Sequence, residues 1–244
     1  QSQDSIMKTE RIDTQPNPLG ASSIRDELNF LLTNRVPRIA LTHLMGWYSR
    51  IESPALTRLS IAVWRLFTKL DFSDAVGEGR YRSLHECFTR ALKPGARPLD
   101  MRPDVLTSPC DAIVGACGTV HGTQAWQCKG MPYAIEELLG SAEAAAPYRH
   151  GRYVTLRLTS AMYHRFHAPA DGRLEHVTYI AGDVWNVNPP ALARVQRLYC
   201  RNERAAMRYR LAHGEPLALV AVAAVLVASV RVHALGLRLH LRHR

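Results

Sequence analysis

Two histidines lie three positions apart in the segment "SAMYHRFHAPADG", residues 160–172. Imidazole titrates near neutral pH, so His164 and His167 are candidates for acid–base chemistry. On a strand they would point to opposite faces, whereas a helical turn begun at Ser160 and ended by Pro169 would bring them to one spot. Packing histidines with satisfied hydrogen bonds remain the alternative. A metal site needs three or four ligands, and no second histidine or cysteine pair supplies them, so we expect no metal.

A carboxylate follows a Ser-Pro turn in a second segment, "TSPCDAIVGACG", residues 107–118. Asp111 precedes an apolar run flanked by glycines, and an aspartate there can simply belong to the turn. It can also orient a histidine, as in arrangements of a nucleophile, a base and an orienting group. Because such partners meet in space, their order along the chain does not decide between these interpretations.

Helices are predicted over residues 23–70. In the segment "ESPALTRLSIAVWRLFTKL", Ser53 is placed as an N-cap and Pro54 suits the first helical position. The spacing predicts a broad apolar stripe (Leu56, Leu59, Ile61, Val63, Trp64, Leu66 and Phe67) with basic neighbours (Arg58, Arg65 and Lys69). A stripe of this kind packs on its own domain or lies in a membrane interface, and both interpretations stay open.

From about residue 81 the sequence changes to short strands and turns. Residues 152–159 alternate, residues 171–188 suggest two strands around "AGD", and residues 205–227 suggest a hairpin turning at 213–216. A short helix is predicted at "YAIEELLG", ended by Gly140. We therefore expect an α+β fold: a disordered polar tail (1–22), amphipathic and membrane-associating helices (23–70), and a mainly antiparallel, β-rich core (71–244).

The 244-residue chain carries a formal net charge of +10, which favours anionic partners. No RNA-binding signature, zinc-finger spacing or recognition helix is present, so we expect anionic lipid rather than nucleic acid. The longest apolar run, residues 217–230, is shorter than the roughly 20 residues of a spanning helix and predicts buried core. Scattered cysteines suit a reduced compartment. We expect a cytosolic protein, with any membrane contact made at its surface.

Several segments, taken in order, resemble one family. The series "SLHECFTRALKPGARPLD", "SPCDAIVG", "QCKGMPYAIEELLG", "YVTLRLTSAMYHRFHAPADG", "IAGDVWNVNP" and "CRNER" is similar to bacterial phosphatidylserine decarboxylases, and the resemblance runs from about residue 36 to the end. It implies a precursor that cleaves itself at a Gly-Ser bond in an LGST-like motif. The serine becomes a pyruvoyl cofactor on a small α chain, and a Schiff base with phosphatidylserine then leads to phosphatidylethanolamine.

The resemblance also implies roles for the three candidate catalytic residues. Asp111 would orient His167, the base for self-cleavage, and His164 would act in decarboxylation. The sequence stops at "LGLRLHLRHR" before any LGST-like motif, and its one Gly-Ser pair, Gly140-Ser141, stands out of order. We therefore expect the pyruvoyl-forming serine beyond Arg244, with this chain supplying the β-chain part and inactive alone.

The partners implied by the resemblance are phosphatidylserine, an anionic membrane surface and the pyruvoyl-bearing α chain. Whether the protein forms a homodimer is left open by the sequence. A second hypothesis of a different class is a non-catalytic protein of the same fold that binds anionic lipid, because the cleavage serine is absent from the sequence.

Overall fold

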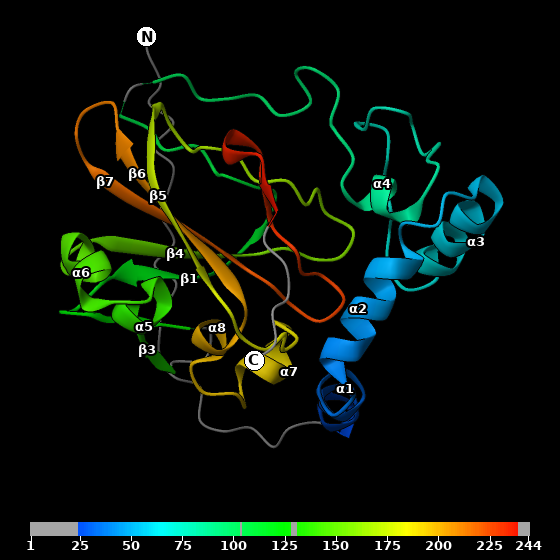
Figure 1. Cartoon of the computed structure of the whole chain (residues 1–244), viewed down its shortest axis with the longest axis horizontal. Coiled ribbons are helices and arrows are strands. Elements are labelled where there is room, and N and C mark those ends of the chain that lie inside the picture. Colours follow the sequence, from blue (N-terminus) through cyan, green and yellow to red (C-terminus); the bar gives the residue numbers. More distant parts are fainter. Residues whose placement is uncertain (1–23, 103, 128–130, 239–244) are drawn as a thin grey trace, which may run out of the picture.

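The N-terminal helices and the antiparallel sheets occupy different sides of the molecule. The computed structural model describes residues 24–102, 104–127 and 131–238, so the predicted tail, residues 1–22, lies outside the described residues. Helices α1 (Ile24–Asn34), α2 (Arg38–Tyr48) and α3 (Pro54–Arg65) follow one another along one side, and the strands lie on the other (Figure 1). This mixture confirms the predicted α+β class.

Helix α3 begins where the sequence predicts. The Ser53 hydroxyl accepts a hydrogen bond from the backbone N–H of Leu56 at 3.4 Å, and Pro54 occupies the first turn. The buried side of α3 carries Thr57 and Ile61, and the Thr57 hydroxyl donates to the Arg82 carbonyl at 3.1 Å. Large apolar residues on its other side remain exposed: Leu59, Val63, Leu66 and Phe67. The stripe is therefore divided: Ile61 and Trp64 pack on a core cluster of the protein itself, whereas these four residues do not.

A three-stranded antiparallel sheet contains β5 (Gly172–Ile180), β6 (Arg204–Leu211) and β7 (Pro216–Val222), in that order. Strands β6 and β7 form the predicted hairpin, and Gly214 in its turn has a φ of +95°. A second sheet pairs β1 (Ile113–Thr119) with β4 (Arg152–Arg157). Two smaller pairs join β2 (Gln124–Trp126) to β3 (Pro132–Ala134) and β8 (Arg231–Val232) to β9 (Leu237–Arg238).

Short helices connect the strands and enclose the main core. They are α4 (Leu84–Phe88), α5 (Ile135–Leu139), α6 (Ala142–Ala145), α7 (Pro189–Leu192) and α8 (Leu198–Arg201), with single 3₁₀ turns at Ala146–Tyr148 and His233–Leu235. Helix α5 ends at Gly140, whose φ of +96° confirms it as a helix C-terminal glycine. Leu192 and Leu198 are almost completely buried in the core between these helices and the strands.

The second strand predicted after "AGD" does not form. In residues 184–188 the backbone N–H of Trp185 donates to the Asn202 side chain at 2.8 Å, and that of Asn186 donates to the Asn34 side chain at 3.1 Å. Side-chain acceptors thus take the N–H groups that a neighbouring strand would otherwise satisfy. Strand β4 forms within the alternating segment 152–159, and its Val154 is exposed.

Polar contacts join the helical side to the β-rich side. The Arg38 guanidinium on α2 lies 2.6 Å from the Asp183 carboxylate, and its Cζ lies 3.7 Å from the centre of the Trp185 ring. Within the described residues, no helix is both long and apolar enough to cross a membrane, and the apolar run from residue 217 supplies strand β7 instead.

Candidate active site

The two histidines lie in an irregular loop between β4 and β5. No helical turn forms over residues 163–168, so the condition under which both rings would face one spot is not met. The loop is held beside the Asp111 turn by the backbone. His167 N–H donates to the Pro109 carbonyl at 2.8 Å, and Thr107 donates to the Pro169 carbonyl at 2.9 Å. The fold therefore brings the two predicted segments together.

His164 is a partly buried, neutral imidazole. Its Nδ1 lies 2.9 Å from the Met162 carbonyl oxygen, which can only accept, so Nδ1 carries the hydrogen and Nε2 keeps its lone pair. Burial lowers the pKa of His164 to about 4, and the nearby charge of Arg90 acts in the same direction. At neutral pH the ring can therefore accept a proton at Nε2.

An aromatic stack holds His164 from the side of the helices. The Phe88 ring on α4 lies 3.9 Å from the imidazole, centre to centre, and the Trp64 ring on α3 stacks on Phe88 at 6.4 Å. The Trp64 indole N–H also donates to the Ser160 hydroxyl at 3.4 Å, at the start of the histidine loop. Helices α3 and α4 together therefore fix the position of His164.

His167 is exposed and is paired with a buried tyrosine. Its Nε2 lies 2.9 Å from the Tyr163 hydroxyl, and the two rings are nearly parallel, with centres 5.7 Å apart. Burial raises the pKa of Tyr163, so its phenol stays protonated and can donate to Nε2. The two histidines thus have different partners and different exposure.

Asp111 is held by an arginine. Its carboxylate accepts two hydrogen bonds from Arg97, at 2.8 and 2.5 Å, and Arg97 also contacts Asp74 at 2.9 Å. Arg97 holds the pKa of Asp111 below its ordinary value, which keeps this carboxylate ionised. No hydrogen bond joins Asp111 to His164 or to His167 in the described structure, although the backbone places their segments side by side.

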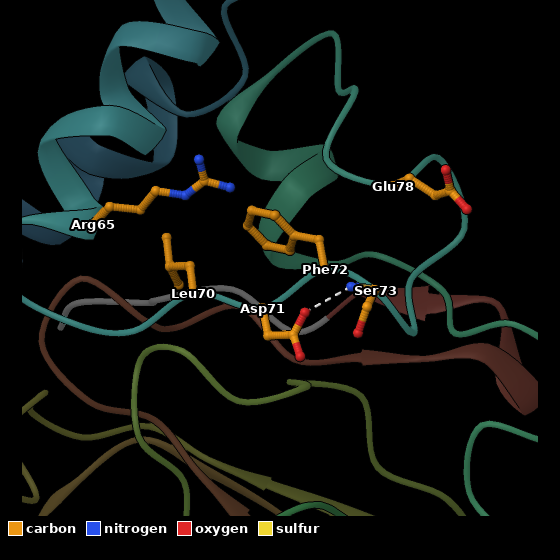
Figure 2. Close-up of a pocket in the computed structure, with 6 residues that line it drawn as sticks. All are labelled: Arg65, Leu70, Asp71, Phe72, Ser73 and Glu78. Carbon is orange, nitrogen blue, oxygen red and sulfur yellow. Dashed lines mark hydrogen bonds between the residues drawn. The ribbon is translucent and has the colours of Figure 1, made fainter.

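Two hollows lie beside the segment that follows α3. The larger, about 440 Å³, is lined by Arg65, Leu70, Asp71, Phe72, Ser73 and Glu78, and Figure 2 shows the Asp71 carboxylate accepting from the Ser73 N–H. The other, about 280 Å³, is lined by Lys69, Asp71, Asp74, Arg90, Arg97 and Asp111 together with residues 161–163. Asp71 lines both, and only the second hollow includes residues of the histidine loop.

Comparison with known proteins decides the family. The sequence model described as phosphatidylserine decarboxylase matches residues 84–240. The chain belongs to the phosphatidylserine decarboxylase family. A protein of Yersinia enterocolitica is 36% identical over 85% of this chain and 70% of its own length; one of Shewanella baltica is 37% identical over 84% and 71%. A protein of Bordetella pertussis is 35% identical over 87% and 72%, and all three are named phosphatidylserine decarboxylase proenzymes.

Four residues of this candidate site were not assigned by sequence reasoning: Phe88, Arg90, Arg97 and Tyr163. Three of them lie in the segment "SLHECFTRALKPGARPLD" and the fourth in the histidine segment. Both segments carry the family resemblance, but nothing in their spacing indicates which side chains contact a histidine or an aspartate. Within the described ranges, no three His, Cys, Asp or Glu side chains gather closely enough to hold a metal ion.

The lowered pKa of His164 should make the stability of this protein depend on pH. The pKa is about 4 in the folded protein and near 6.5 when unfolded, so the unfolded chain binds more protons between these values. The free energy of unfolding should therefore fall as the pH is lowered from about 6.5 to about 4, with roughly 3 kcal/mol due to His164. Urea denaturation across this range measures the loss, and a His164→Gln variant should lack that part of it. Equal losses in the two proteins would contradict the assignment.

Proposed function

We propose that this chain takes part in the pyruvoyl-dependent decarboxylation of phosphatidylserine to phosphatidylethanolamine, as the β-chain part of the enzyme. The observation that carries the proposal is His164, a neutral base fixed beside a charged hollow by Phe88 and the Met162 carbonyl. Membership of the decarboxylase family supports it.

His164 would handle the protons of the reaction. The substrate's ammonium group must lose a proton before its nitrogen can react, and the Nε2 lone pair of His164 can accept it. After carbon dioxide leaves, the serine Cα needs a proton, which the imidazolium can return. A bound pyruvoyl group would supply the electron sink for the bond cleavage. The aromatic stack keeps the imidazole in one orientation throughout.

His167 and Asp111 would serve the maturation of the proenzyme. A serine hydroxyl is a weak nucleophile until a base removes its proton, and the exposed ring of His167 is accessible for this step. Its Nε2 faces the Tyr163 hydroxyl and Asp111 is bound to Arg97. We infer that self-cleavage needs the Asp111 carboxylate to turn from Arg97 towards His167. The two segments are held together by the hydrogen bond from the His167 backbone N–H to the Pro109 carbonyl.

The helical side would bind the cytoplasmic face of the membrane as a peripheral surface. Leu66 and Phe67 at the end of α3 are 79% and 83% exposed, and Trp47 on α2 and Leu59 on α3 are also open to solvent. Basic residues lie among them: Arg58, Arg65 and Lys69. An exposed apolar surface with basic neighbours suits the interface of a membrane that carries anionic lipids.

A charge placed on this surface should reduce membrane binding. Replacing both Leu66 and Phe67 with aspartate removes two apolar contacts and adds repulsion, so we expect vesicle binding to fall at least about tenfold. Flotation with phosphatidylserine-containing vesicles measures the change. Leu99→Asp is the matched control, because Leu99 is 66% exposed but lies outside the helices. Wild-type binding by the double variant would contradict the peripheral surface.

The proposed activity is tested on the product of the full reading frame that contains this chain. We expect two bands on a denaturing gel and the release of carbon dioxide from phosphatidylserine. A product that never cleaves, or cleaves without decarboxylating, would overturn the proposal. Vesicle binding without cleavage would favour the alternative, a non-catalytic lipid-binding protein.

A further inference from the structure

Arg90 is a buried cation without a carboxylate partner. It is 5% exposed, and its guanidinium donates only to backbone carbonyls, at 3.2 Å to Ala161 and 3.5 Å to Cys87. Its Nε has no hydrogen-bond partner, and no ion pair involves Arg90 within the described residues. An arginine keeps its charge at all working pH values, and a buried charge without a hydrogen-bonded counter-ion is unfavourable. The charge is offset in part by the Phe72 ring, 5.3 Å from its Cζ, and by the nearby Asp111 carboxylate, but the unpartnered Nε–H leaves room for an anion from outside the chain.

The position of Arg90 places that anion in the smaller hollow. Arg90 lines this space of about 280 Å³, and Lys69, which has no carboxylate within ion-pair distance among the described residues, lines it too. The third cation, Arg97, is bound by two carboxylates, those of Asp74 and Asp111. The lining carboxylates suit a positive group on the same ligand, since they outnumber the cation that they bind and Asp71 accepts hydrogen bonds from Ser73 and Phe72 rather than from a charged side chain. The charges thus match a small ligand that has both a phosphate and an ammonium group.

The surroundings favour a lipid headgroup over a free phosphate compound. Lys69 and Asp71 come directly after the exposed Leu66 and Phe67, so the hollow opens next to the apolar end of α3. Its opposite wall is formed by residues 161–163 of the histidine loop. The charge of Arg90 acts on both His164 and Asp111, which shows that the guanidinium lies near them. A phosphate held there would have its serine group only a few bonds away, towards His164.

We propose that this hollow binds the phosphodiester of a phospholipid headgroup, with Arg90 as its main ligand and Lys69 as its second. The inference rests on the proposed function, which it deepens by assigning residues to substrate binding. Arg90 and Lys69 would hold the phosphate, while the carboxylates that also line the hollow would favour headgroups that carry an ammonium group.

The test measures binding, which does not need the pyruvoyl group. The chain is titrated calorimetrically with dihexanoyl-phosphatidylserine below its micelle concentration and, separately, with inorganic phosphate. Arg90→Gln should weaken lipid binding at least about tenfold, since hydrogen bonds between charged groups are lost. Arg90→Lys should retain part of the affinity. Arg102→Gln is the control, because Arg102 is exposed and pairs with Asp100; its affinity should stay within about twofold of wild type.

Each outcome decides the inference. An affinity for the lipid that is unchanged in both Arg90→Gln and Arg90→Lys overturns the inference. Inorganic phosphate that binds as tightly as the lipid also overturns it, because the hollow would then be a site for free phosphate. If Arg90→Gln fails to fold, the variant Lys69→Gln, at an exposed position, decides instead. Its affinity for the lipid should fall by about threefold or more. An unchanged affinity in this variant would overturn the inference.

The full-length enzyme separates this inference from the proposed function. Arg90→Lys should raise the KM for phosphatidylserine more than it lowers kcat. If Arg90→Lys decarboxylates the lipid with the same KM as the wild type, only the headgroup assignment is contradicted. If the wild-type protein itself never decarboxylates phosphatidylserine, the proposed function is contradicted.

Discussion

A full-length proenzyme that carries His167→Ala is expected to remain one uncleaved chain, with its rate of self-cleavage reduced by about 10²-fold or more. His167 is exposed beside the Asp111 turn, and without its imidazole the loop keeps only His164, whose ring is partly buried and stacked on Phe88. Denaturing gels sampled over time measure the rate. Because uncleaved protein contains no pyruvoyl group, decarboxylation should be lost with it.

The control for this prediction is another exposed histidine. His213 lies in the turn between β6 and β7, and His213→Ala should cleave like the wild type. Cleavage of His167→Ala at the wild-type rate would show that the base lies elsewhere. Tyr163→Phe adds a further comparison, since it keeps the stacked ring and removes only the hydroxyl that contacts Nε2.

The second large effect is expected from His164→Gln. We expect this variant to cleave itself nearly normally and to decarboxylate about 10²- to 10⁴-fold more slowly, because the proton acceptor at Nε2 is lost. The reason is geometric: His164 Nδ1 is bound to the Met162 carbonyl and its ring is stacked on Phe88, away from the contacts of His167. Carbon dioxide release per cleaved molecule separates turnover from maturation.

His85→Gln provides the matched control for a buried histidine. His85 lies on α4, and burial lowers its pKa as it does for His164, so both substitutions remove a neutral imidazole from a partly buried position. His85→Gln should decarboxylate at close to the wild-type rate. An equal loss of cleavage and decarboxylation in His164→Gln would contradict separate roles for the two histidines.

Local sequence signals predicted much of this fold. The Ser53-Pro54 start of α3, the hairpin of β6 and β7, and the Gly140 cap each depend on a few neighbouring residues, and all three are observed. The strand expected over residues 184–188 failed for the opposite reason. Its N–H groups donate to the side chains of Asn34 and Asn202, which come from α1 and from the end of α8. The pattern of neighbouring residues cannot predict partners that lie so far away in the sequence.

The candidate site shows the same division. The resemblance singled out His164, His167 and Asp111, and the structure places their segments together. The contacts that set their chemistry depend on the folded arrangement. Arg97 reaches Asp111 across 14 positions of sequence, and Phe88 reaches His164 from helix α4. Burial, which makes His164 a neutral base, is likewise a property of the packed molecule rather than of its own segment.

The stack of Trp64, Phe88 and His164 imposes unequal constraints on the two sides of helix α3. Leu59 and Leu66 contact solvent and need only remain large and apolar, so many substitutions there should be interchangeable. Trp64 must keep both its ring and its N–H, because it supports Phe88 and binds Ser160. Under the proposed function, substitutions at Leu59 and Leu66 would change the attachment of this helix to different membranes and leave the position of His164 unchanged, as long as Trp64 is kept.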